Sequence, residues 1–159
     1  PVLPVRRSGT LTPSPETKGS DMSQENKELV RSWFEAVSRH DIDAVAEMVA
    51  TDVVNNSSTN QGREGTRAEL AYWFAAFPDA SVAVEDLIAE GDRVVARLIT
   101  TGTHQGEFMG APPTGTQVSF QEIDIFRIEN DEIAETWAAP DVFALLTQLG
   151  MLPTEEHAG

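Results

Sequence analysis

The sequence predicts an α+β domain in which helices pack against one face of a curved antiparallel sheet. Apolar residues recur at helical spacing as far as Pro78, and from Ser81 onward they alternate with polar residues as in strands. Helices and strands are therefore segregated along the chain, which is typical of α+β rather than α/β architecture. The 159 residues, of which 40% are hydrophobic, suffice for one domain with one core.

Three helices are expected before the strand pattern begins. Ser23 is the expected N-cap of the first helix, and either Asp41 or Asp43 caps a short second helix. The polar, turn-rich segment 55–65 predicts a loop, after which Thr66 caps the third helix. The expected apolar positions of the first and third helices are Leu29, Val30, Trp33, Phe34, Val37, Leu70, Trp73, Phe74 and Phe77.

Four strands and a final helix are expected in the second half of the chain. Glu90-Gly91-Asp92 and Asn130-Asp131 predict tight turns, so that consecutive strands pair antiparallel as a meander. The Gly- and Pro-rich segment 106–115 predicts a longer loop within this meander. Asp141 is the expected N-cap of the last helix, and Gly150 is its C′ residue. The expected strands are residues 81–89, 93–103, 117–128 and 133–139.

The first 21 residues differ in composition from the rest of the chain. They hold four of the nine prolines, mixed with Ser, Thr and Gly, and they show no apolar periodicity. We therefore expect residues 1–21 to be a flexible tail or a remnant of an expression vector, and residues 22–159 to be a single domain.

Composition argues against several classes of function. The net charge of −15 repels nucleic-acid phosphates and anionic lipids, so we expect neither a nucleic acid nor a membrane as partner. Without cysteine the chain has no disulfide, thiolate nucleophile or zinc–thiolate site, which fits a cytoplasmic location. The histidines are far apart and no phosphate-binding loop is present, so we expect no metal and no cofactor.

The long third strand carries the most informative polar residues. Alternation places Phe120, Glu122, Asp124 and Phe126 on one face. Carboxyl groups that share a face with two phenylalanines are desolvated, which raises their pKa toward values that suit a general acid or base. Two other interpretations remain open: this face lies against solvent, or the acids pair with an arginine such as Arg97 or Arg127.

Other candidate residues come from the rest of the predicted pocket, which lies between the helices and the sheet. Trp33 and Trp73 either fill an ordinary core or line the pocket. His104, at a strand end, is either a structural group or one that orients or protonates a substrate. Asn55 is either a turn residue or an amide donor at the pocket rim.

Three motifs resemble those of a known family. They are Gly102–Gly115 (GTHQGEFMGAPPTG), the strand residues 123–128 with 133–137, and Leu145–Gly150 (LLTQLG). Together they make residues 26–150 similar to the SnoaL-like polyketide cyclases, which have the nuclear transport factor 2-like fold. The resemblance implies a cone-shaped barrel, a deep pocket, a homodimer formed through the sheet, and cofactor-free closure of a polyketide ring by an intramolecular aldol reaction.

The resemblance also identifies departures at the site. The general base of the aldol cyclases is an aspartate on the last strand, and Ala138 stands at the matching position. Two active-site histidines match Thr136 and Asp124, whereas the pocket asparagine has its counterpart in Asn55. Either Asp124 therefore serves as the base, or the reaction is not an aldol closure.

The register of the last hairpin bears on this choice. A two-residue turn pairs Asp124 with Trp137, whereas a three-residue turn with a bulge pairs it with Thr136 and sets Ala138 opposite Glu122. The resemblance favours the bulged form, because it brings both family positions into one pocket.

The sequence leaves three functions open. The first is a cyclase or isomerase that uses a general base on a hydrophobic polyketide, and the second is a shape-driven closure such as a cycloaddition. The third is a small-molecule-binding module or a partner subunit of a hydroxylase. The predicted catalytic residues are Asp124 and His104, and the predicted substrate-binding residues are Asn55, Trp33, Trp73, Phe120, Glu122, Phe126, Thr136 and Ala138. The predicted dimer interface holds Arg97, Gln121, Arg127, Leu98, Ile123 and Ile125.

Overall fold

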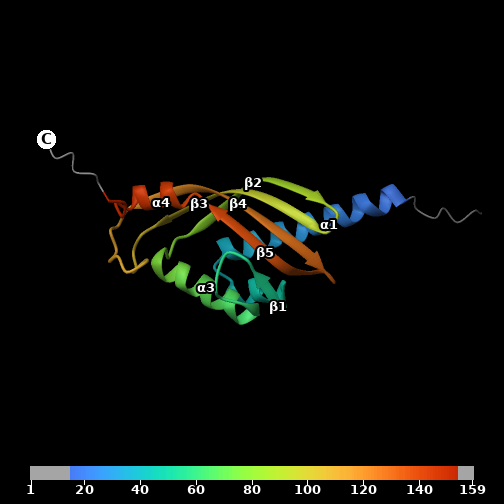
Figure 1. Cartoon of the computed structure of the whole chain (residues 1–159), viewed down its shortest axis with the longest axis horizontal. Coiled ribbons are helices and arrows are strands. Elements are labelled where there is room, and N and C mark those ends of the chain that lie inside the picture. The colour runs from blue at the N-terminus through green and yellow to red at the C-terminus, as the bar shows by residue number, and fades with distance from the viewer. Residues whose placement is uncertain (1–14, 154–159) are drawn as a thin grey trace, which may run out of the picture.

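In residues 15–153, which the computed structural model describes, five strands form one sheet and the helices pack against it (Figure 1). The helices are α1 (Pro15–Ser38), α2 (Ile42–Glu47), α3 (Gly62–Ala76) and α4 (Val142–Gln148). The strands are β1 (Val49–Asn55), β2 (Ser81–Glu90), β3 (Arg93–Thr103), β4 (Gln117–Glu129) and β5 (Glu132–Pro140). The order across the sheet is β1-β5-β4-β3-β2.

The predicted α+β class and the antiparallel meander are confirmed. Strands β2 to β5 pair in sequence order, and their bounds lie close to the expected ones. Asp41 is the cap of α2, because its side chain accepts from the backbone N–H of Ala44 at 3.0 Å. Asp141 caps α4 in the same way, and Gly150 adopts the left-handed conformation at φ 67°.

Strand β1 was not predicted, and it changes the character of the sheet. It pairs parallel with β5, so the sheet is mixed and open rather than a closed antiparallel barrel. The polar pair Thr51-Asp52 interrupts any apolar alternation in β1. The strand with which β1 pairs, β5, lies some eighty residues further along the chain. The pairing brings Asn55 beside Thr136 and so carries the asparagine to the predicted pocket.

Two helices begin earlier than expected. Helix α1 starts at Pro15 rather than at Ser23, and α3 starts at Gly62 rather than at Thr66. A helix that tertiary packing stabilises further along propagates into a polar segment at little cost, and such an extension leaves no apolar pattern to predict it. Residues 1–14 of the predicted tail, like residues 154–159, lie outside the described residues.

The β4–β5 hairpin has neither of the two expected registers. Its turn has two residues, Asn130 and Asp131, both with positive φ as a tight hairpin requires. Ala134 then forms a bulge in β5, which shifts the pairing by one residue. As a result Asp124 lies directly opposite Ala138.

The core lies between α1 and the inner face of the sheet. Val30 and Phe34 of α1 pack with Leu98 of β3 and Phe126 of β4, all of them buried. Leu98 therefore belongs to the core and not to the predicted dimer interface, because neighbouring residues of a strand face opposite sides. No helix within residues 15–153 has the length and apolar composition to cross a membrane.

Candidate active site

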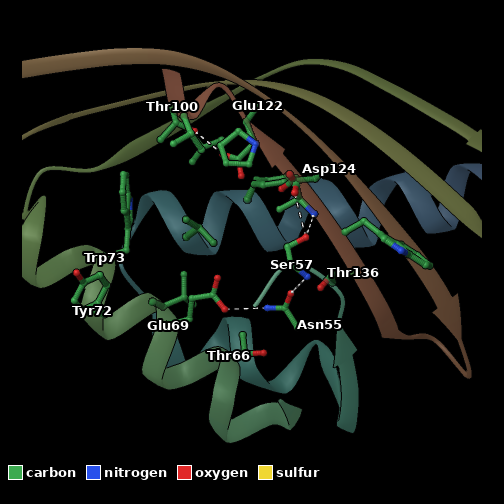
Figure 2. Close-up of a pocket in the computed structure, with 18 of the residues that line it drawn as sticks. Asn55, Ser57, Thr66, Glu69, Tyr72, Trp73, Thr100, Glu122, Asp124 and Thr136 are labelled. Carbon is green, nitrogen blue, oxygen red and sulfur yellow. Dashed lines mark hydrogen bonds between the residues drawn. The ribbon is translucent and has the colours of Figure 1, made fainter. Parts of the chain in front are cut away.

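A cavity of about 560 Å³ lies between the inner face of the sheet and helices α1, α3 and α4. This volume is typical of pockets that enclose a small organic molecule. Aromatic and aliphatic side chains make up most of its wall, and the polar groups gather in two places (Figure 2). One group lies on β4 and the other lies across the cavity, on β1 and α3.

The structure brings the predicted site residues together, with one exception. All of them except His104 line the cavity, and they come from α1, β1, α3, β4 and β5. The lining residues among those predicted are Trp33, Asn55, Trp73, Phe120, Glu122, Asp124, Phe126, Thr136 and Ala138.

The first polar group is a pair of carboxyl groups on β4. Asp124 is 7% exposed, and its carboxyl group is hydrogen-bonded to that of Glu122. Burial raises the pKa of Asp124 to about 9, and the charge of Glu122 adds to this shift. Burial also raises the pKa of Glu122, which accepts a hydrogen bond of 3.2 Å from the Thr100 hydroxyl. Near neutral pH the pair therefore holds a proton.

Neither alternative interpretation of this face holds. The acids do not face solvent, and the two arginines of the neighbouring positions point away from them. Arg97 forms an ion pair of 2.7 Å with Asp86, and Arg127 forms one of 2.9 Å with Glu135. Because these arginines lie on the outer face of the sheet, the carboxyl pair is left without a cation.

One atom of the pair has no partner. Among residues 15–153, Oδ1 of Asp124 is one of few buried side-chain polar atoms that make no hydrogen bond, and Nε1 of Trp33 is another. Both residues line the cavity. A buried polar atom without a partner is costly, so these two atoms are available to a bound molecule as acceptor and donor.

The second polar group lies on the opposite wall. Glu69 accepts a hydrogen bond of 2.9 Å from Nδ2 of Asn55, whose Oδ1 accepts one of 2.9 Å from the backbone N–H of Ser57 (Figure 2). Burial raises the pKa of Glu69. Glu69 was not among the predicted site residues, although its spacing from Tyr72 and Trp73 places all three on one face of α3.

Ser57 closes the side of the cavity next to β5. Its hydroxyl accepts from the backbone N–H of Ala138 at 2.7 Å and donates to the carbonyl of the same residue at 3.1 Å. The serine thus continues the β1–β5 contact beyond the last paired residues and fixes Ala138 opposite Asp124.

His104 is not on a cavity wall, contrary to the prediction. Alternation does place it on the inner face of the sheet, but the ring of Phe77 stacks on it at 5.5 Å and covers it. Its Nδ1 lies 3.0 Å from the Thr114 hydroxyl and accepts from the backbone N–H of Thr114 at 3.3 Å. These contacts tie the loop after β3 to the sheet, so we assign no catalytic role to His104.

The charged residues among those described that line the cavity are all acidic. Among the described residues that line it, none is lysine, arginine or histidine, while three are acidic. Within residues 15–153, no group of histidine and acidic side chains is arranged to hold a metal ion. The arrangement can accept and donate protons, and it favours an uncharged organic molecule over an anion.

Comparisons with known proteins agree on one family. The model of the SnoaL-like polyketide cyclases matches residues 27–149. The aklanonic acid methyl ester cyclase DnrD of Streptomyces peucetius is 30% identical over 129 residues, which cover 77% of this chain and 89% of that relative. The nogalonic acid methyl ester cyclase of Streptomyces nogalater is 30% identical over 113 residues, which cover 68% and 84%.

A solved structure supports the same assignment. AclR from Streptomyces galilaeus, a proposed hydroxylase, is 33% identical and superposes with a TM-score of 0.75. The match covers 82% of this chain and 99% of AclR. Sequence and fold thus lead to one conclusion: the chain belongs to the SnoaL-like polyketide cyclase family.

Proposed function

We propose that this protein closes a ring in a carbonyl-rich, uncharged polyketide ester by an intramolecular aldol reaction that uses no cofactor. The relatives named as methyl ester cyclases support the substrate class. The observation that carries the proposal is the unpartnered Oδ1 of Asp124, which belongs to a buried carboxyl pair in a largely apolar cavity. The curated relatives are cyclases, which favours catalysis over a binding module.

The carboxyl pair would act as one base. In the resting state Asp124 holds the proton and shares it with the Glu122 carboxylate. Oδ1 of Asp124 takes a proton from a substrate carbon that is flanked by carbonyl groups, and the proton already on Asp124 passes to Glu122. The C–H electron pair becomes an enolate, to which Nε1 of Trp33 and the second Nδ2 hydrogen of Asn55 can donate.

The carboxyl pair takes no part in forming the carbon–carbon bond. The enolate carbon forms a bond to a ketone carbon of the same molecule, the C=O π bond breaks, and the resulting alkoxide takes up one proton while the pair releases the one that it took from the substrate carbon. Product and substrate are isomers, so atoms and charge balance. Holding the two ends together contributes at most ~7–11 kcal/mol to lowering the barrier, and the base adds ~10²–10⁴ in rate.

The position of the pair supports the proposal that a carboxylate on β4 serves as the base in place of one on β5. The resemblance to the aldol cyclases implies a catalytic aspartate at the position of Ala138, and Asp124 is the residue directly across from it. Facing residues of an antiparallel pair have Cβ atoms only ~4.5–5.5 Å apart. A carboxyl group at 124 therefore reaches nearly the same part of the cavity as one at 138.

Conversion of aklanonic acid methyl ester and nogalonic acid methyl ester tests the proposal, with the product followed by chromatography at unchanged mass. We expect Asp124→Asn to lower kcat by ~10²–10⁴ with substrate Kd unchanged. Glu129→Gln is the matched control, because Glu129 lies exposed on the same strand. Unchanged turnover in Asp124→Asn would indicate a shape-driven closure, and no conversion by the wild type would exclude this substrate class.

We also propose a homodimer, formed through the outer face of the sheet. Ile88 and Ile123 are 65% and 48% exposed there, and they alternate with the ion pairs of Arg97 and Arg127. Such a mixed face suits contact with a second copy of itself. Ile123→Glu should convert a dimer to a monomer in light scattering, and a monomeric wild type at micromolar concentration would refute the proposal.

We also propose that the protein is located in the cytoplasm, because a chain without cysteine fits a reducing compartment.

A further inference from the structure

We infer that Glu69 is a second catalytic residue, which donates a proton to the ketone oxygen from the wall opposite the Asp124–Glu122 pair. This inference rests on the proposed aldol closure and adds the group that completes it. A ring-closing aldol needs a base at one carbon and an acid at an oxygen some distance away. The cavity has titratable groups on two facing walls and thus provides for both.

The local structure holds Glu69 in place for such a role. Its Oε2 accepts from Asn55 Nδ2 at 2.9 Å, and the Ser58 hydroxyl also bonds to the carboxyl group. Asn55 is fixed in turn, because Gln61 donates to its carbonyl at 2.7 Å and accepts from its N–H at 2.9 Å. With Oε2 held by Asn55, a proton on the carboxyl group sits on Oε1.

Glu69 and the carboxyl pair face a common space. Figure 2 shows Glu69 and Asn55 along one wall and Glu122 and Asp124 along the other. When it is ionised, Glu69 contributes to raising the pKa of both Glu122 and Asp124. Burial raises the pKa of Glu69 as well, which favours its protonated form.

The polar groups that line the cavity with Glu69 are acidic or neutral. They include Glu122 and Asp124 from β4, Thr100 from β3, Asn55 from β1, and Tyr72 and Trp73 from α3. No lysine or arginine among the described lining residues stabilises a carboxylate at position 69. A substrate that fills the cavity removes water from this wall and further favours the neutral acid.

The proton steps balance over one turnover. The pair takes one proton from the substrate carbon, the C–C bond forms, and Oε1–H of Glu69 passes its proton to the alkoxide. The pair is then left with one extra proton and Glu69 with one fewer. When the product leaves, water in the open cavity returns the proton from the pair to Glu69, so no external acid or base is consumed.

Two substitutions separate proton donation from the positioning of Asn55. Glu69→Gln keeps an oxygen that can accept from Asn55 but cannot supply an acidic proton, whereas Glu69→Ala loses both. With aklanonic acid methyl ester we expect Glu69→Gln to lower kcat at least ~10²-fold with unchanged Kd, and Glu69→Ala to weaken binding as well. Glu64→Gln, an exposed change on the same helix, should behave as the wild type. A kcat of Glu69→Gln within about threefold of wild type overturns the inference.

A second measurement is independent of turnover. Carboxyl-carbon NMR titration should place the pKa of Glu69 above that of an ordinary glutamate. A Glu69 pKa at or below that of an ordinary glutamate would overturn the inference even if the wild type converts neither ester, an outcome that by itself counts only against the proposed function.

Discussion

Replacing Asp124 with asparagine should make the fold more stable at neutral pH while it removes the proposed base. Burial, with the charge of Glu122 as the second cause, raises the pKa of Asp124 to about 9 in the folded protein. In an unfolded chain the pKa of an aspartate is about 3.9. Folding at neutral pH therefore requires Asp124 to bind a proton, whereas asparagine is neutral in both states.

The size of the effect follows from this difference. Below the unfolded pKa both states are protonated and nothing is lost. As the pH rises from about 3.9 toward about 9, the folded state holds one more proton than the unfolded state, and stability falls by about 1.4 kcal/mol per pH unit. By pH 7 the loss reaches about 4 kcal/mol. Because Glu122 shares the proton, we expect Asp124→Asn to gain roughly 2–4 kcal/mol at that pH.

Guanidinium unfolding, followed by tryptophan fluorescence over about pH 4 to 9, measures this gain. The free energies of unfolding of wild type and Asp124→Asn should nearly coincide near pH 4 and separate as the pH rises. The asparagine amide can still donate to Glu122 and accept from the Ala139 backbone, so the packing is kept. Glu129→Gln should show no such separation. A variant less stable than wild type at pH 7, or a gap that does not change with pH, would refute the reasoning.

Three further outcomes are expected. Proton abstraction should speed up as the pH rises toward 9, because Asp124, whose pKa burial raises to about 9, then loses the shared proton and the pair becomes the stronger base; exchange of the acidic substrate hydrogen with solvent deuterium that slows over this range would contradict this. Turnover should survive EDTA, because the proposed transfers use carboxyl groups alone; loss on chelation and recovery with a divalent metal would count against the proposal. Gly106→Ala should lower the free energy of unfolding by ~2 kcal/mol or more in the same denaturation assay, because a Cβ there collides with the Ala75 carbonyl; wild-type stability would show that the loop yields.

The elements that the sequence predicted well are those with a local signal. Strands β2 to β5 alternate apolar and polar residues and are separated by turn residues, and Asp141 with Gly150 marks both ends of α4. The inner face of β4 followed from the same alternation, so Asp124 and Glu122 were found as candidates. Period and turn chemistry thus suffice for most of the meander and for one wall of the cavity.

What the sequence did not predict depends on contacts between distant segments. Strand β1 is defined by its pairing with β5, and the bulge at Ala134 is set by how that hairpin fits the sheet. Glu69 was missed because helical spacing shows which residues share a face but not what that face meets. His104 was wrongly expected on a cavity wall. Alternation gave its face of the sheet correctly, but it could not show that Phe77 covers the ring.

The bulge at Ala134 determines which two residues of β4 and β5 face each other at the cavity wall. Because the bulge sets residue 124 opposite residue 138, two facing positions on neighbouring strands can each direct a carboxylate into the same part of the cavity. Exchanging the residue types at these two positions takes two substitutions, and the pairing of the two strands does not depend on which position holds the carboxylate. Alanine at position 138 therefore does not by itself mean that the cavity lacks a carboxylate, because Asp124 lies directly across from it. Positions 124 and 138 are therefore best considered together when a carboxylate is sought in this cavity.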